Sequence, residues 1–181
     1  YGYHRSGQSA LLARRLVERG VTFVTMIDPG VGLSSSGWDF HKTLEQHTKT
    51  ASPPMDLAVT TLINDLHERG LDKKVLVVVW AEFGRTPMLQ GDRATAGRDH
   101  HKDAFSYWLA GGGVRGGQVI GKTDDLGYYP VEDPVEIHDL HATILQLLGL
   151  DHEQLTYTHN GRDERLTDVY EAQVIRPLID S

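Results

Sequence analysis

Apolar residues near the start of the chain recur at helical spacing and then give way to a continuous apolar segment. Residues 9–19 place apolar side chains at positions 10, 12, 13, 16 and 17, and Gly20 stands where glycine commonly ends a helix. Residues 21–27 (VTFVTMI) are rich in β-branched side chains, which predicts a strand. The glycines, serines and proline of residues 28–37 predict a loop.

The same order then repeats. Pro53 and Pro54 open a second predicted helix, which Gly70 ends, and residues 75–80 (VLVVVW) form an uninterrupted apolar run. A strand that does not alternate is typical of a parallel sheet covered by helices on both faces. Two helix–strand repeats with short connections therefore predict right-handed crossovers and an α/β layered fold.

The second half of the chain continues the alternation of strands and helices. Strands are predicted at 104–110 and 119–120, and a helix at 138–148, with Asp139 as its N-cap, Gly149 after its end, and Leu140, Ile144, Leu147 and Leu148 facing inward. One more helical segment is predicted near Val174. Because no linker or internal repeat divides the chain, residues 1–181 are expected to form a single domain.

Charge and composition narrow the classes of partner. The net charge of −7 and pI near 5.8 disfavour a nucleic-acid partner, which needs a basic face. The longest apolar run, residues 75–81, is far too short for a membrane span. No cysteine is present, so disulfides, iron–sulfur clusters and thiol nucleophiles are excluded, and any metal must be held by His, Asp and Glu. Oligomeric state cannot be predicted.

Carboxylates and imidazoles follow the predicted strands in three separate segments. Asp39 and His41 follow the first strand and its loop, Glu82 comes directly after the second strand, and His100 precedes the third. Ligands of open α/β sheets bind beyond the carboxyl ends of the strands. These four residues therefore predict a divalent-metal site (Zn, Ca, Mg or Mn), since such ions take His and carboxylate ligands when thiolates are absent.

Ordinary structural roles would explain the same residues equally well. Aspartates are common in loops because they favour turns. Glu82 and Arg85 could form an ion pair that stiffens their loop, and His100 or His101 could cap the following strand. Arg85 and Arg98 lie beside the predicted ligands and could bind an anionic substrate. They could equally neutralise the nearby carboxylates.

A phosphate-binding pattern also occurs in residues 116–123, GGQVIGKT, which match G-x-x-x-x-G-K-T. A true P-loop joins a buried strand to a helix whose first turn meets the phosphates. Here Val119 and Ile120 predict a strand where the turn should be. Residues 124–130 (DDLGYYP) begin with two acidic residues and are interrupted by Gly and Pro, so they do not predict a helix. A nucleotide-binding function is therefore the least favoured hypothesis.

Several motifs together resemble a bacterial family of sulfatase-like proteins of unknown function, grouped with the alkaline-phosphatase superfamily. They are WDFH at 38–41, EFGRTP at 82–87, GRDH at 97–100, AGGGVRGG at 110–117, HDLHATIL at 138–145, LLGLDHE at 147–153 and GRDERLTD at 161–168. The resemblance implies a doubly wound, mostly parallel sheet in an α/β/α sandwich, alkaline-phosphatase-like. It also implies that Asp39, His41, Glu82 and His100 ligate a metal, and it suggests a periplasmic or other extracytoplasmic location.

The chain departs from the superfamily pattern in two respects. Glu82-Phe83 stands where the superfamily has Asp-His, which puts a two-metal site in doubt. The superfamily's nucleophile lies in a segment upstream of the matched motifs, so the chain is expected to be the C-terminal portion of a larger domain.

Two functions follow from these residues. The first is a metal-dependent hydrolase of small anionic sulfate or phosphate esters, in which Arg85 or Arg98 steadies the transferred group and Asp99 orients a ligating imidazole. The second is a non-catalytic metal- or anion-binding protein on the same fold.

Overall fold

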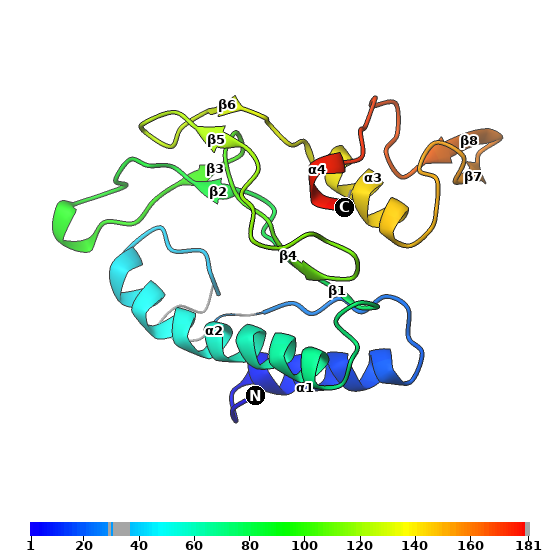
Figure 1. Ribbon diagram of the computed structural model, residues 1–181. Helices are drawn as coiled ribbons and strands as arrows, with labels where there is room; N and C mark the ends of the chain where they lie inside the picture. The colour runs from blue at the N-terminus through cyan, green and yellow to red at the C-terminus, as the bar shows by residue number, and fades with distance from the viewer. Residues whose placement is uncertain (29, 31–36, 180–181) are drawn as a thin grey trace.

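The computed structural model describes residues 1–28, 30 and 37–179. The described residues form four α-helices and four two-stranded antiparallel sheets, which do not assemble into layers (Figure 1). The elements in order are α1 (Arg5–Glu18), α2 (Leu44–Glu68), β1 (Leu76–Val79), β2 (Gly84–Arg85), the 3₁₀ turn η1 (Arg93–Thr95), β3 (His100–His101), β4 (Trp108–Gly111), β5 (Lys122–Thr123), β6 (Pro130–Glu132), α3 (Ile137–Leu147), β7 (Thr156–His159), β8 (Arg162–Arg165) and α4 (Arg176–Ile179).

The helices α1 and α2 pack side by side through small residues and through hydrogen bonds that converge on Asp65, which forms a structural hub (Figure 1). Ala10 of α1 and Ala58 of α2 are each only 1% exposed, and small side chains allow the two helices to approach closely. Asp65 of α2 accepts hydrogen bonds from Arg14 Nε (2.9 Å), Arg69 Nε (2.6 Å) and the Tyr1 hydroxyl (2.6 Å). These donors satisfy the carboxylate, and they hold the pKa of Asp65 below its usual value, with the Tyr1 hydrogen bond as the largest cause.

The two prolines lie inside α2 rather than at its start. The helix begins at Leu44, so the predicted start at Pro53 is wrong by about two and a half turns. Proline is favoured in a first helical turn because its missing N–H needs no partner there. Inside α2, Pro53 and Pro54 leave two carbonyls of the preceding turn without a helical hydrogen bond.

The sheet topology contradicts the predicted doubly wound parallel sandwich. The described residues form four separate two-stranded sheets, and every pairing is antiparallel. The predicted strand at 104–110 becomes β4, which runs antiparallel to β1 with Val79 opposite Trp108. The apolar run at 75–80 therefore forms one strand of a two-stranded antiparallel sheet whose partner follows β2 and β3 in the chain, and its strand residues are half-buried rather than covered on both faces.

Two other predicted strands do not form, so no layered sheet can be built from them. Residues 21–27 belong to no strand, and Val21, Phe23 and Ile27 are exposed. The predicted strand at 119–120 is also absent, and β5 begins at Lys122 instead. The accessible surface is 12414 Å², whereas a compact monomer of this mass exposes about 8,800 Å². The two-stranded sheets of the described residues thus share no continuous core of the kind that a sandwich requires.

The third helix is tied to the last described segment of the chain. Asp139 accepts from the N–H of Glu136 at 3.0 Å, so Asp139 lies in the first turn and Glu136, not Asp139, is the N-cap. The Thr143 hydroxyl accepts from the N–H of Ile175 at 2.9 Å. The predicted inward face is partly wrong, because Leu140 is buried while Leu148 is 47% exposed.

Among the helices of residues 1–28, 30 and 37–179, none combines the length and apolar character needed to cross a membrane.

Candidate metal centre

Three chain segments lie against one another at the site, and backbone hydrogen bonds join them. Lys42 forms an antiparallel bridge with Ala96, and Gln90 forms another with Gly97. The strands β2 and β3 extend the same contact, with Arg85 opposite His100. Backbone pairing therefore holds together residues 38–44, 84–90 and 95–101. It fixes the backbone positions from which their side chains extend.

Gly97 is the position where these segments come closest. A Cβ atom on residue 97 would lie 2.0 Å from the carbonyl carbon of His41 and 2.4 Å from the nitrogen of Lys42. Both contacts are with backbone, which cannot swing aside as a side chain could. Glycine is thus required here by space, and it allows the segment leading to His100 to lie directly on the segment that carries Asp39 and His41.

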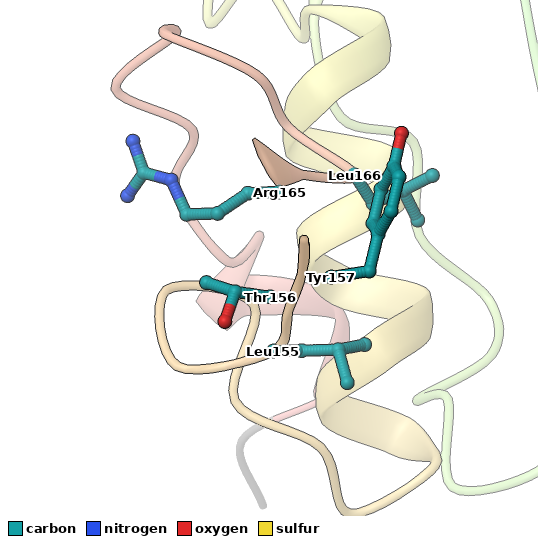
Figure 2. A pocket seen from close by; sticks show the side chains of 5 residues that line it. All are labelled: Leu155, Thr156, Tyr157, Arg165 and Leu166. Atoms are coloured by element: carbon teal, nitrogen blue, oxygen red, sulfur yellow. The ribbon is translucent and has the colours of Figure 1, made fainter. Parts of the chain in front are cut away.

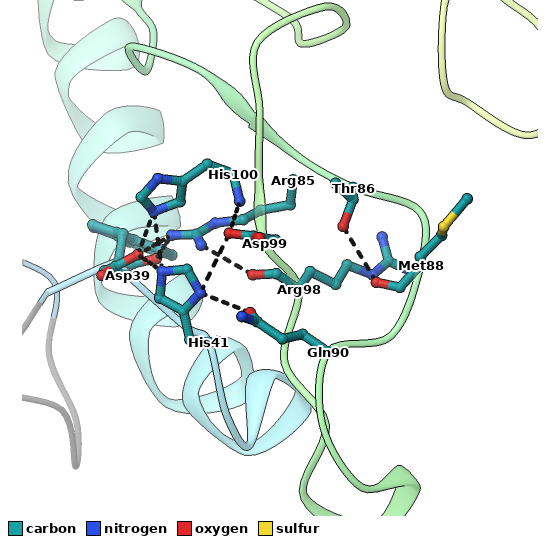
Figure 3. Close-up of polar contacts among 10 residues, drawn as sticks. Asp39, His41, Arg85, Thr86, Met88, Gln90, Arg98, Asp99 and His100 are labelled. Carbon is teal, nitrogen blue, oxygen red and sulfur yellow. Dashed lines mark hydrogen bonds and ion pairs between the residues drawn. The ribbon is translucent and has the colours of Figure 1, made fainter.

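Asp39, His41 and His100 bring their polar atoms to one point (Figure 3). Asp39 Oδ1 lies 2.8 Å from His41 Nε2 and 2.9 Å from His100 Nε2. The two Nε2 atoms are 3.1 Å apart. The side chains are 34–45% exposed, so this cluster of one carboxylate and two imidazoles is open to solvent on one side.

Arg85 holds the carboxylate of this cluster in place. Its Nη2 donates to Asp39 Oδ1 at 2.7 Å and to the carbonyl of Trp38 at 3.2 Å, and its Nη1 donates to the carbonyl of Arg98 at 3.1 Å. The pKa of Asp39 is lowered to about 2, first by the His100 hydrogen bond and then by the one from Arg85. Asp39 is therefore a carboxylate at neutral pH, and Arg85 pairs with it rather than with Glu82.

The remaining predicted site residues lie outside the group of three. Glu82 is exposed between β1 and β2 and is not one of the three clustered ligands. Figure 3 shows the Arg98 side chain running away from both imidazoles toward Thr86 and Met88. Asp99 Oδ1 accepts the N–H of His100 at 2.8 Å and lies 3.8 Å from His41 Nδ1, beyond hydrogen-bond reach.

Two residues that contact the imidazoles were not predicted. Gln90 Oε1 lies 2.7 Å from His41 Nδ1, and the Phe83 ring lies against the His100 ring with centroids 4.1 Å apart. Phe83 belongs to the EFGRTP motif and could have been found through it. Gln90 stands in a segment of mixed composition that carries no recognisable pattern, and only the bridge to Gly97 brings it to the site.

Two hollows formed by described residues lie away from the cluster, and none of its three members lines either of them. One, of ≈ 410 Å³, is lined by Leu155, Thr156, Tyr157, Arg165 and Leu166 of the β7–β8 hairpin region (Figure 2). The other, of ≈ 640 Å³, lies between the end of α2 and the loop after β4. The P-loop pattern is not realised either, because Lys122 and Thr123 form strand β5 where a P-loop would begin its helix.

The fold and the cluster thus define a protein of small two-stranded antiparallel sheets that joins two imidazoles and a carboxylate at one exposed point. Residues 1–179 match the family described as "Protein of unknown function (DUF1501)", and the chain belongs to this family. No curated protein and no solved structure matches the chain.

Proposed function

We propose that Asp39, His41 and His100 bind a divalent cation and that the protein is a metal-dependent hydrolase of sulfate or phosphate esters. The convergence of the three ligand atoms supports the metal site. All three lie within 4.8 Å of one another, although they come from chain positions up to 61 residues apart.

The hydrogen-bonding capacity of Asp39 supports a cation at this point. Its Oδ1 atom faces three nitrogen atoms, from Arg85, His41 and His100, at 2.7–2.9 Å. A carboxylate oxygen has two lone pairs, so it cannot accept three good hydrogen bonds at once. A cation bound by the two Nε2 lone pairs and this oxygen satisfies all three ligands together, and Asp39 keeps its ion pair with Arg85.

The donor set matches the chemistry of such a cation. Two imidazoles and one carboxylate suit zinc, manganese or iron, and three protein ligands leave positions for water and substrate. When bound, the metal would act as a Lewis acid and lower the pKa of a coordinated water. The chain's own contribution is to hold Asp39 ionised, to fix both imidazoles against it, and to leave one side open.

The substrate class rests on the resemblance of the WDFH, EFGRTP and GRDH motifs to sulfatase-like proteins. In the alternative function, the same site binds a metal or anion without catalysis. The engagement of Arg85 favours this alternative, because its guanidinium is committed to Asp39 and two backbone carbonyls. That leaves it fewer donors for a substrate anion.

Metal binding is tested by titrating Zn²⁺, Mn²⁺, Ca²⁺ and Mg²⁺ into protein freed of metal with a chelator, using calorimetry. We expect one ion per chain in the wild type and loss of this binding in His100→Ala. His159→Ala, which removes an exposed imidazole from β7, is the matched control and should bind normally. Equal binding by wild type and His100→Ala would refute the site.

Hydrolysis is tested on aryl sulfate and aryl phosphate esters with the preferred metal. Turnover that is lost in His100→Ala and kept in His159→Ala supports the hydrolase. Tight metal binding without turnover by the whole protein supports the non-catalytic alternative instead.

A further inference from the structure

The side chain of Gln90 lies beside one of the two ring nitrogens of His41. Its Oε1 atom lies 2.7 Å from His41 Nδ1. An amide oxygen can only accept a hydrogen bond, so the proton between these two atoms belongs to His41 Nδ1. In the neutral imidazole the other nitrogen, Nε2, then has a free lone pair.

Gln90 is itself fixed by the backbone. Its N–H donates to the carbonyl of Gly97 at 2.9 Å, and its carbonyl accepts from the N–H of Gly97 at 3.0 Å. Gly97 in turn lies directly against the backbone of His41. The backbone of Gln90 is therefore held beside that of His41, and its exposed side chain reaches the imidazole from this fixed starting point.

The free lone pair of His41 faces the point where the ligand atoms meet. Nε2 lies 2.8 Å from Asp39 Oδ1 and 3.1 Å from His100 Nε2. A nitrogen lone pair and a carboxylate oxygen repel each other at this distance unless a positive charge stands between them. The neutral Nδ1–H form is also the form in which an imidazole binds a metal through Nε2.

We propose that Gln90 is a positioning residue that holds His41 in the Nδ1–H tautomer and so prepares Nε2 as a metal ligand. The proposal rests on the proposed metal site, but its first consequence, the tautomer, can be measured without any metal. Asp99 is the other acceptor near Nδ1, and at 3.8 Å it makes no hydrogen bond to that atom. Gln90 therefore carries the effect.

The tautomer is read from nitrogen-15 NMR of the histidine side chains in the metal-free, full chain at a pH where His41 is neutral. We expect His41 in the Nδ1–H form in the wild type. Gln90→Leu keeps the size of the side chain but removes the acceptor, so it should produce a mixture of tautomers. Gln90→Glu restores an acceptor and should restore the Nδ1–H form.

Zinc affinity is measured on the same proteins by calorimetry with Zn²⁺ alone. Gln90→Leu should weaken binding by about tenfold, as is usual when the partner of a ligating histidine is removed. Gln90→Glu should recover it, and Asp99→Asn should change it by no more than about threefold. Thermal melting followed by circular dichroism shows that each variant is folded.

The outcomes for Gln90 and for the metal site are separable. A wild-type His41 in the Nε2–H form, or a tautomer unchanged in folded Gln90→Leu, would overturn the role of Gln90 even if zinc binds. The expected tautomers without any metal binding would support the control of His41 by Gln90 and overturn both the metal site and the role of Gln90 in preparing a ligand.

Discussion

Two aspartates, Asp65 and Asp39, each have three nitrogen or hydroxyl groups of other side chains within 2.9 Å, and the nature of those groups separates a structural hub from a candidate site. Asp65 is 16% exposed and takes its hydrogen bonds from two arginines and a tyrosine, which keep their protons at neutral pH. Asp39 is 41% exposed and takes two of its three contacts from imidazoles, which can give up a proton and bind a metal.

This difference shows that two carboxylates with similar hydrogen-bond geometry can have partners of different chemistry. Both carboxylates have lowered pKa values, because nearby donors stabilise the charged form in each case. A lowered pKa alone therefore does not identify a functional site. The identity of the partners is more informative, because an imidazole nitrogen can exchange its hydrogen bond for a metal bond and a guanidinium cannot.

The largest expected effect is on stability, at the structural hub. Asp65→Ala removes the acceptor that Arg14, Arg69 and Tyr1 share and leaves the buried Arg14 side chain, 8% exposed, with Glu18 as its remaining carboxylate partner. It should lower the free energy of unfolding by about 3 kcal/mol because three hydrogen bonds to a charged group are lost. Urea unfolding measures the loss. Asp56→Ala, at an exposed position of the same helix, should change stability by less than about 0.5 kcal/mol. Equal effects of the two variants would contradict a structural role for the hydrogen bonds of Asp65.

Gly97→Ala should damage the candidate site more than the fold. The added Cβ meets the backbone of His41, so the segments must separate, at a cost of about 2 kcal/mol. Zinc affinity should fall more than tenfold, since His100 shifts away from Asp39. Gly116→Ala, where a Cβ meets nothing within 4 Å and no unusual backbone angle is needed, is the matched control. Normal zinc binding by Gly97→Ala would show that the close approach is dispensable.

The pH dependence of stability should separate the two aspartates further. A carboxyl group with a lowered folded pKa stabilises the protein above its unfolded pKa, near 3.8, and this contribution disappears as the pH falls through the folded value. Asp65→Asn should therefore flatten the fall in stability below pH 4, as measured by urea unfolding at a series of pH values. Asp39→Asn should flatten it less, between pH 4 and about 2, because solvent screens this exposed group. A greater flattening in Asp39→Asn would reverse the comparison.

The smallest effect is expected at Glu82. Because this carboxylate is exposed and lies outside the clustered ligands, Glu82→Gln should change zinc affinity by no more than about threefold. Calorimetry with Zn²⁺ measures it beside His100→Ala. A loss as large as that of His100→Ala would show that Glu82 is a ligand, as the strand-end pattern predicts.

The helices α1 and α3 could be predicted because their signals are local, whereas the two prolines inside α2 hid its start. The apolar spacing before Gly20 and before Gly149 places α1 and α3 to within a few residues. The position of β1 was equally clear, but its partner was not, because pairing is decided by distant segments. An apolar run such as Val75–Trp80 is typical of a parallel strand, yet here it pairs antiparallel with β4.

The residues of the candidate site also divide into those that local sequence predicts and those that long-range contacts place. Asp39 and His41 are two residues apart, so their convergence could be predicted, and His100 could be found through its motif. The predicted place of Glu82 depended on strands ending at a common sheet edge, and no such sheet forms among the described residues. Gln90 could not be predicted, because its position depends on the long-range bridge to Gly97.

The separation of the two imidazoles along the chain has a consequence for folding. His41 and His100 are 59 residues apart, so a cation bound to both would close a long loop in the manner of a cross-link. Unlike a disulfide, this cross-link would be reversible, and its strength would follow the free metal concentration. At a hundred times the dissociation constant it would add about 2.7 kcal/mol to stability, so changes in metal supply would alter how long the folded chain survives.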